Sequence, residues 1–443
     1  MTNIEPKKKK RNTWSLIPSI LAAAACFTVL GGYLNINGYH VLQLSMLWIG
    51  ALGGLAAGGL YAALSTLSPR LCRLNNLVLL NLFITLVGVE AILHAMQDRL
   101  PHSVVEMLPR DARERLMKNR GGFVTENIAG DKMLYAWKPD ATFSNLPWLK
   151  VDANGYRNPS IPQSVNVVLL GDSVTIAQNS KHDMAHFLRE KGVSVLNLGF
   201  SGYGPYQQRD AYQKYVLNTK ISHQIVLINF CFCNDVTDAK SYEQTQRRGG
   251  TWKDYMGTTP SKNAYPFAFN PSWVTSIIFH LPFKAVQAYR NDNNKAKDVV
   301  INLPRGAVNV PGGLLPTDPQ NLDASDWKPA LTALADIIRR ATSVGAQVVL
   351  AYYPNFPQLY MQGLPSSSPA RVAAHHDYND SLVQLNQLIK QEGGVLIDYT
   401  KAMQEGNAKS PVSSSNSDYH PNTLGTEIMA ATAYPAIQEY LGN

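Results

Sequence analysis

Apolar and polar positions divide the chain into two parts with different patterns. From Asn12 to Pro69 the sequence contains no Asp, Glu, Lys or Arg. A helix needs about 20 apolar residues to cross the hydrocarbon core of a bilayer, so this run is long enough for two crossings. Another apolar run follows it, and the pattern predicts transmembrane helices near residues 14–34, 42–65 and 74–96.

The second predicted membrane helix carries small residues at helical spacing. Gly50, Gly54 and Gly58 recur at every fourth position. Small side chains on one helix face let two backbones approach closely in lipid. We therefore expect this face to contact a partner helix in the membrane.

Beyond about residue 160, short apolar runs alternate with helical patterns. The predicted strands lie at 165–172, 193–200, 223–232, 346–354 and 394–400. The predicted helices lie at 184–192, 205–218, 327–344, 376–393 and from about 422 onward. Continuously apolar strands that alternate with helices indicate a parallel sheet covered on both faces. The predicted fold class is therefore α/β, a flavodoxin-like three-layer sandwich with a parallel sheet of about five strands.

These patterns give a predicted domain organisation. We expect a membrane anchor at 1–98, a connecting segment at 99–161 and an α/β domain at 162–443 with an insertion at about 240–326. Loops of that length are uncommon in compact domains, so we expect an ordered insertion beside the functional site. Its aromatic residues are Trp252, Tyr255, Tyr265, Phe267, Phe269 and Trp273. They are candidates for stacking on sugar rings, and a local hydrophobic cluster under a long loop is the alternative.

The distribution of charge predicts a membrane topology and argues against nucleic acid as a partner. The net charge is +8, and the five cationic residues at 7–11, set against Glu5, account for four of that excess. The remainder has no basic patch interleaved with aromatics, so nucleic acid is not an expected partner. The cationic tail and Arg70 with Arg73 predict cytoplasmic ends, which leaves everything after about residue 97 outside the cytoplasm. We expect a multi-pass protein of the cytoplasmic (inner) membrane.

The four cysteines, at positions 26, 72, 231 and 233, form neither the disulfide framework of a small secreted domain nor a zinc-binding pattern. Cys231 and Cys233 lie two positions apart on a predicted strand. We expect them to be small core residues rather than a bridge or metal ligands, because free cysteine is among the most buried residue types. No metal or organic cofactor is indicated.

Polar residues and glycines follow the predicted strands at their carboxyl ends, where ligands bind in folds of this class. Asp172 and Ser173 follow the first strand, Gly202 follows the second and Asn234 follows the third. An Asp or Ser in such a place also serves as a helix N-cap, which is the structural alternative for this pair.

A candidate partner for the serine stands near the C-terminus, in the stretch "SDYHPNTLG". A nucleophilic serine needs a base, and the base needs an orienting group. His420 and Asp418 supply both, because alternate residues of an extended segment face the same way. The backbone N–H groups of Ser173 and Gly202 and the amide of Asn234 are suitable donors to an oxyanion.

The combined motifs resemble a known family. "GDSVT", "NLGFSGYG", "CFCNDV" and "DYHPN" resemble the four blocks of the SGNH (GDSL-like) hydrolase superfamily, and "VDANGYRNP" (151–159) resembles the lead-in of its membrane-anchored members. The similarity covers roughly residues 150–240 and 346–443. It implies that Ser173 is the nucleophile, that Gly202 and Asn234 complete the oxyanion hole and that His420 is the base.

The chain departs from the family pattern at two positions. Phe232 stands where the family often has Gly, two residues before Asn234. Ser417 stands where the family usually has its Asp, three residues before His420, whereas this chain places Asp418 two residues before it. Some polysaccharide-acylating relatives share the shorter spacing, so Asp418 remains the candidate for orienting the imidazole.

Two functions from different classes are consistent with these features. The first is a membrane-anchored, extracytoplasmic serine esterase or O-acyltransferase that acts on acyl esters, acetyl esters above all, of a cell-envelope or exported glycan. The second is a non-catalytic subunit of a polysaccharide assembly or export machine that binds glycan or serves as a scaffold. Fold alone does not separate them. The complete Ser-Gly-Asn-His set favours the enzyme.

Overall fold

The computed structural model describes part of the chain. The described residues are 40–41, 44–45, 125–128, 130–143, 146–178, 180–255 and 298–442. Within them, no helix has both the length and the apolar character needed to span a bilayer. The expected membrane helices and the Gly50/Gly54/Gly58 face lie outside these ranges, apart from residues 44–45. These form β2 (Leu44–Ser45), which pairs antiparallel with β1 (His40–Val41). Residues 44–45 are thus extended, and the predicted helix at 42–65 was wrong there.

A five-stranded parallel sheet forms the centre of the compact unit made of residues 121–259 and 292–443. Its strands are β5 (Ser164–Leu170), β6 (Val195–Asn197), β7 (Ser222–Cys231), β10 (Gln347–Tyr353) and β11 (Val395–Asp398). They lie in the order β6-β5-β7-β10-β11, and every neighbouring pair is parallel. In chain order this is 2-1-3-4-5, the flavodoxin-like arrangement. The predicted α/β fold with a parallel sheet of about five strands is confirmed, and the strand order reverses between β5 and β7.

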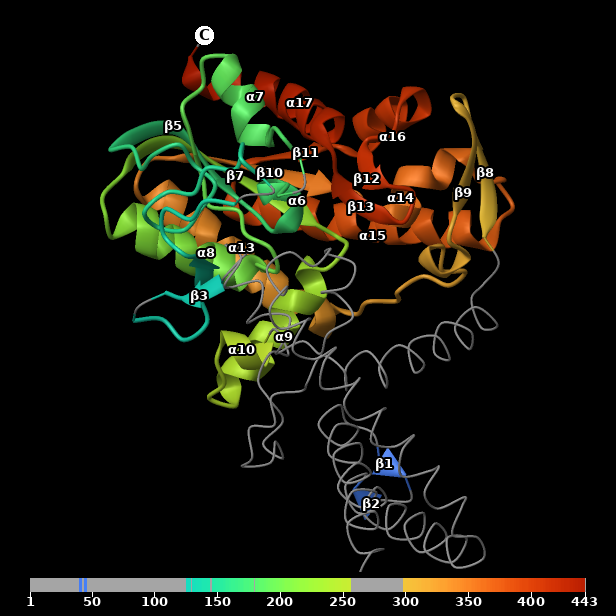
Figure 1. The fold of residues 1–443 in the computed structure, drawn as a ribbon, viewed down its shortest axis with the longest axis horizontal. Coiled ribbons are helices and arrows are strands. Elements are labelled where there is room, and N and C mark those ends of the chain that lie inside the picture. Colours follow the sequence, from blue (N-terminus) through green and yellow to red (C-terminus); the bar gives the residue numbers. More distant parts are fainter. Residues whose placement is uncertain are drawn as a thin grey trace, which may run out of the picture. The chain divides into compact units, whose positions relative to one another are not determined.

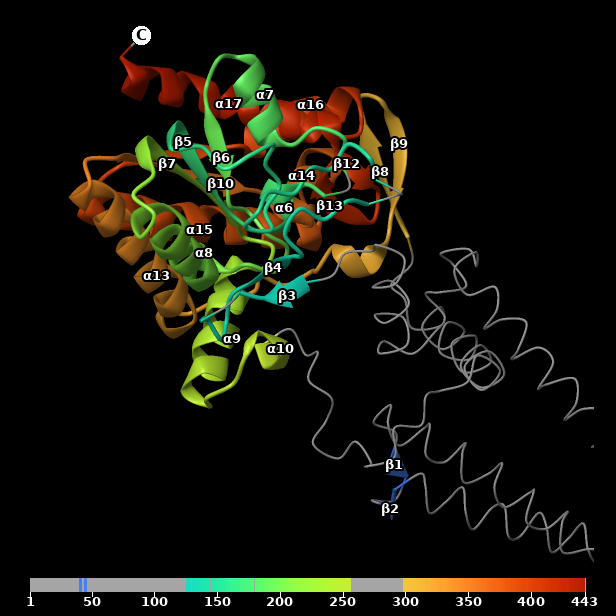
Figure 2. The same cartoon turned by 60° about the vertical axis from the view of Figure 1, so that its left-hand side comes forward.

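Helices cover both faces of this sheet (Figures 1 and 2). One face carries α7 (Met184–Glu190), α16 (Thr400–Lys409) and α17 (Thr423–Leu441). The other face carries α8 (Pro205–Tyr212), α13 (Ala324–Ser343) and α15 (Pro369–Glu392). Successive side chains of β7 point to opposite faces of the sheet. Val226 and Ile228 pack on the side of α13. Ile225 and Leu227 pack on the side of α17. Burial on both sides explains why these strands read as unbroken apolar runs.

Regular elements occupy much of the predicted insertion at 240–326. Helix α9 (Asp235–Arg247) runs through its start, α10 (Trp252–Tyr255) follows, and β8 (Val299–Leu303) pairs with β9 (Gly306–Val310) before α13 begins. The described residues of the insertion are thus ordered, as expected, although the sequence pattern indicated none of these helices and strands. Only a few residues of α9 are buried. The sequence therefore shows too few apolar positions at helical spacing to indicate this helix. Tyr265, Phe267, Phe269 and Trp273 lie outside the described residues.

The segment expected to connect anchor and domain belongs to the core from residue 128 onward. It contains β3 (Thr125–Asn127) and β4 (Tyr135–Trp137), which pair antiparallel. Tyr135, Trp137 and Tyr156 are buried in the cluster that also holds α13. Trp252 is buried too, with its ring stacked on Tyr135 at a centroid distance of 5.1 Å. The compact unit therefore begins well before residue 162, and Trp252 is a core residue rather than a surface for sugars.

Candidate active site

Ser173 stands at the carboxyl end of β5, beside the point where the strand order reverses. It is the first residue of α6 (Ser173–Ile176), and Asp172 is the N-cap, with its Oδ1 accepting from the N–H of Val174 at 3.0 Å. Asp172 therefore serves as the helix N-cap, which was the structural alternative for the pair, and Ser173 can still be a site residue. The hydroxyl of Ser173 lies 3.4 Å from Oδ2 of Asp172, and it has a second partner at a shorter distance.

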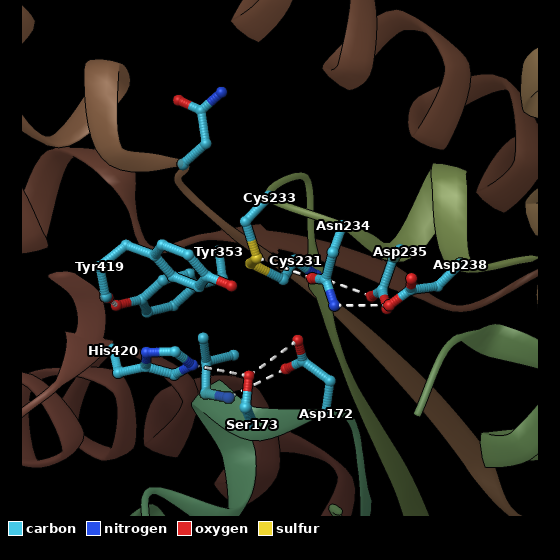
Figure 3. Close-up of a disulfide and its surroundings, with 12 residues drawn as sticks. Asp172, Ser173, Cys231, Cys233, Asn234, Asp235, Asp238, Tyr353, Tyr419 and His420 are labelled. Carbon is cyan, nitrogen blue, oxygen red and sulfur yellow. Dashed lines mark hydrogen bonds between the residues drawn. A yellow bond between two sulfur atoms is a disulfide. The ribbon is translucent and has the colours of Figure 1, made fainter. Parts of the chain in front are cut away.

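That partner is His420, which lies on β13 (Asp418–Pro421), a strand paired with β12 (Ser413–Ser415). The Nε2 of His420 lies 2.9 Å from Oγ of Ser173, and its Nδ1 lies 2.5 Å from Oδ1 of Asp418 (Figure 3). A carboxylate only accepts, so Nδ1 carries the proton and Nε2 is left to accept from the serine hydroxyl. Ser417 bonds to the hydroxyl of Ser415 instead. The structure thus brings Asp418, not Ser417, to the imidazole.

Tyr353, the last residue of β10, fixes the segment that carries the histidine. Its buried hydroxyl donates to the carbonyl of Tyr419 at 2.6 Å. The ring of Tyr419 in turn stacks on the imidazole of His420 at a centroid distance of 4.5 Å. Sequence reasoning missed Tyr353, although a polar group at the carboxyl end of a central strand is the signal that could have found it.

The loop after β6 presents Gly202 to the same edge of the sheet. Gly202 has φ +76, a conformation that side chains rarely adopt. The hydroxyl of Tyr135 donates to the carbonyl of Ser201 at 3.0 Å, and that of Tyr255 donates to the carbonyl of Gly202 at 2.9 Å. In the described part of the chain, no group accepts from the N–H of Gly202 or of Ser173. Both N–H groups remain available to a ligand.

Asn234 follows β7, and its amide is held at both ends. Its Nδ2 donates to Oδ2 of Asp238 at 2.6 Å, one turn along α9. Its Oδ1 lies 2.8 Å from Sγ of Cys233. In Figure 3 the amide nitrogen lies on the side of Asp172 and Ser173. The amide therefore has one N–H fixed by Asp238 and the other directed to the side of Asp172 and Ser173.

Three acidic residues lie close to Ser173 and Asn234, namely Asp172, Asp235 and Asp238. Burial raises the pKa of Asp172, and it raises that of Asp235 well above the usual carboxyl range. Burial and the nearby Asp172 together raise the pKa of Asp238 to about 7. Close carboxylates in a dry setting cannot all ionise, so the cluster carries less charge near neutrality than three carboxylates would. Sequence reasoning gave no role to Asp238, although a residue four positions after Asn234 lies on the same face of a helix that begins there.

Cys231 and Cys233 form a disulfide, so the expectation of two unbridged core residues was wrong. Strand β7 ends at Cys231 and the chain turns there, with the N–H of Asn234 donating to the carbonyl of Cys231 at 3.3 Å. The turn brings the two Cα atoms to 5.1 Å, within the range that a disulfide requires. An oxygen of Asp172 and both sulfurs lie within 4.8 Å of one another, yet bridged sulfurs are not thiolates and do not ligate a metal in this form.

Arg157, in the stretch "VDANGYRNP", clamps the turn that follows the serine. Its guanidinium donates to four carbonyls at 2.7 to 3.0 Å, those of Ile176, Ala177, Ser180 and Lys181. These include carbonyls at the end of the one-turn helix α6, which have no partner within the helix. The arginine is buried and its Nε lies 3.6 Å from Asp183, which balances its charge. Arg157 thus fixes the C-terminal end of the helix that begins with Ser173.

Tyr156, the residue before Arg157, stabilises the loop that carries Gly202. The hydroxyl groups of Tyr156 and Tyr203 lie 3.0 Å apart, and Tyr203 also donates to the carbonyl of Tyr135. Tyr203 directly follows Gly202 and is fully buried. The stretch "VDANGYRNP" therefore holds the serine turn through Arg157 and the glycine loop through Tyr156.

A small cavity opens beside the serine. Among the described residues it is lined by Ser173, Ala177, Gln178, His420 and Pro421, and its volume is about 30 Å³. One water molecule needs about 10–15 Å³ of such space, so the cavity holds about two waters. Ser173 and His420 therefore face a narrow space.

Comparisons with known proteins give a likeness in fold only. No family model matches the chain, and no curated protein matches it. Among solved structures it is similar to a GDSL-like lipase from Bacteroides thetaiotaomicron, with 15% identity, 62% of this chain and 88% of that chain covered, and a TM-score of 0.32. It is also similar to an acetylxylan esterase from Geobacillus stearothermophilus, with 12% identity, coverage of 62% and 94%, and a TM-score of 0.32.

A psychrotrophic esterase from Pseudoalteromonas sp. is similar at 13% identity, with coverage of 64% of this chain and 100% of that chain and a TM-score of 0.30. At these scores the likeness adds nothing to the chemistry of the site. The residues and distances given above define that chemistry by themselves.

Proposed function

We propose that this protein is a serine esterase or acyltransferase that works through an acyl-enzyme on Ser173. The observation that carries the proposal is the continuous hydrogen-bonded series from Ser173 through His420 to Asp418. Nε2 of His420 takes the proton from the serine hydroxyl as its Oγ attacks the ester carbonyl. Asp418 holds the imidazole in the required tautomer and stabilises the imidazolium that forms.

The tetrahedral intermediate carries a negative oxygen that needs fixed donors. The unengaged N–H groups of Ser173 and Gly202 and the Nδ2 of Asn234 supply them. Each such donor contributes about 10²- to 10³-fold to the rate in comparable sites. When the intermediate collapses, imidazolium returns its proton to the departing alcohol, and the acyl group stays on Oγ of Ser173.

The second half of the reaction decides between hydrolysis and transfer. His420 removes a proton from the incoming hydroxyl, which belongs either to water or to a sugar. The same residues perform both reactions, so the outcome depends on which acceptor reaches the acyl-enzyme. We propose a sugar acceptor for this protein, in keeping with the family resemblance of its motifs.

The substrate that we propose is a short acyl ester of a glycan, with acetyl as the acyl group. The cavity of about 30 Å³ beside Ser173 supports a short acyl group, because a long chain would need far more room. The glycan is supported by the resemblance to polysaccharide-acylating relatives.

We also propose that the α/β unit lies outside the cytoplasm, on a membrane anchor formed by the N-terminal part of the chain. The uncharged run from Asn12 to Pro69 and the cationic residues at 7–11 support this arrangement. The Cys231–Cys233 disulfide supports it independently, since disulfides persist in oxidising compartments.

One assay tests the activity and the acceptor together. Para-nitrophenyl esters of increasing acyl length are incubated with the full chain, with and without an added oligosaccharide, and with Ser173→Ala as the control. We expect turnover of the acetyl ester, loss of turnover as the acyl chain lengthens, and acetylated oligosaccharide detected by mass spectrometry. Acid release that no oligosaccharide alters, with no acetylated sugar, would leave a plain esterase. No turnover of any ester would favour a non-catalytic glycan-binding subunit.

A further inference from the structure

The disulfide lies inside the turn that carries the oxyanion-hole asparagine. Cys231 and Cys233 are the first and third residues of this turn, and Asn234 is the fourth. Figure 3 shows the bridge beside the Asn234 amide, with Ser173 and His420 nearby. We propose that the Cys231–Cys233 disulfide positions Asn234 for catalysis, and that its reduction lowers the acyl-transfer rate reversibly. This inference rests on the proposed function.

One end of the bridge is fixed by the sheet. Cys231 is fully buried and pairs in register with Tyr353 of the neighbouring strand. Its N–H donates to Oδ2 of Asp235 at 2.8 Å. Moving Cys231 would break these contacts at the centre of the core. Any rearrangement of the bridge therefore falls on Cys233 and on the residue after it.

The other end of the bridge touches the catalytic amide. Sγ of Cys233 lies 2.8 Å from Oδ1 of Asn234, and Asp238 holds Nδ2 from the opposite side. The amide is therefore confined between a sulfur and a carboxylate. Two sulfur atoms that are no longer bonded need roughly 4 Å of separation instead of about 2 Å. Because Cys231 is fixed, the movement falls on Sγ of Cys233, and this changes its contact with the amide oxygen.

A displacement of that size matters for catalysis. A misplacement of about 1 Å in a reacting group can cost about 10²-fold in rate. The amide of Asn234 acts on the oxyanion, which exists in the transition state and not in the bound ester. We therefore expect reduction to lower kcat and to leave KM nearly unchanged.

A thiol can reach the disulfide at only one of its two sulfur atoms. Cys233 is partly exposed, whereas Cys231 is fully buried, so a reducing dithiol attacks Sγ of Cys233. The S–S bond breaks, and its electron pair leaves on Sγ of Cys231, which takes up a proton. The second thiol of the reductant then closes its own disulfide and releases Cys233 as a thiol. The protein gains two electrons and two protons, and a disulfide oxidant reverses the process.

The test uses the full chain with Cys26→Ser and Cys72→Ser, so that the reductant acts only on the bridge. Oxidised and dithiothreitol-reduced protein are compared on the acetyl ester, and the free thiols in each are counted by alkylation and mass spectrometry. We expect no free thiols before reduction and two after it. We further expect kcat to fall by about 10- to 100-fold on reduction, with recovery after reoxidation and an unchanged circular dichroism spectrum.

Two variants separate positioning from a general structural role. In Asn234→Ala, kcat is already low by about 10²- to 10³-fold, and reduction should cause no further loss, because the group that the bridge positions is gone. The double variant Cys231→Ser with Cys233→Ser should have the reduced rate and no response to dithiothreitol. A further loss on reduction of Asn234→Ala would contradict the inference.

Failure of the inference differs from failure of the proposed function. An active oxidised protein whose kcat does not change on reduction contradicts the inference alone, as does a protein with two free thiols before reduction. An oxidised protein that turns over no ester contradicts the proposed function, and the inference falls with it.

Discussion

The imidazole nitrogen Nε2 of His420 lies 2.9 Å from Oγ of Ser173, although 247 positions separate the two residues in the chain. Each residue reaches this place by a different route. Ser173 stands where β5 ends beside β7, and His420 is carried there by the β12–β13 pair. A parallel sheet brings the carboxyl ends of its strands to one edge, so distant segments meet there.

The spacing of the acid and the histidine leads to a direct prediction. Asp418→Asn should lower kcat by about 10⁴-fold, because an amide favours the tautomer in which Nε2 cannot accept the serine proton. Ser417→Ala is the matched control and should leave kcat within about twofold, since its hydroxyl bonds only within its own turn. Steady-state kinetics on the acetyl ester measures both. Equal losses in the two variants would mean that another group orients His420.

Replacing Arg157 should lower both kcat and the melting temperature of the protein. Arg157→Lys keeps the charge but loses the fork that reaches four carbonyls, so the end of α6 should loosen and kcat should fall by about 10-fold or more. Arg189→Lys is the control, because Arg189 is partly buried and donates to Asn158 and to the carbonyl of Val195, away from α6. Both variants should melt earlier, and only Arg157→Lys should lose rate. Matched losses of rate would remove the special role of Arg157.

Sequence reasoning reached the sheet and the central pair because both leave strong local signals. The five strands are continuous apolar runs, and Ser173 and His420 stand in motif contexts of their own. The supporting groups leave weaker signals. Tyr353, Arg157 and Asp238 act through contacts with residues far along the chain or across a turn. The disulfide was missed because a strand pattern that continues to residue 232 hides the turn after Cys231.

The raised pKa of Asp238 predicts a pH dependence of stability. Its pKa is about 7 in the folded protein against 3.8 for an ordinary aspartate, so the folded state holds the extra proton between these values. Stability therefore falls as pH rises through this window, by up to about 1.4 kcal/mol per pH unit. Asp238→Asn should reduce the difference in the free energy of unfolding between pH 5 and pH 7 by about 2 kcal/mol, as measured by urea titration. An unchanged difference would assign the effect to other groups.

The proposed topology predicts where each segment lies. Reporter domains fused after residues 40 and 110 should report the outside, and one fused after residue 70 should report the cytoplasm. The cationic residues at 7–11 and the pair Arg70 and Arg73 are the physical basis for this assignment. Reporter activity in cells measures each fusion. A cytoplasmic result after residue 110 would exclude an envelope glycan as the substrate.

The most direct measurement of the central claim is covalent labelling of the nucleophile. A fluorophosphonate loses fluoride to an activated serine and leaves a phosphonyl group on Oγ, which peptide mass spectrometry can locate. We predict that the label resides on Ser173, that Ser173→Ala takes up none, and that His420→Ala labels at least 10²-fold more slowly because its serine lacks a base. Absence of label from the folded wild-type protein, or a label on another serine that persists in Ser173→Ala, would contradict the account.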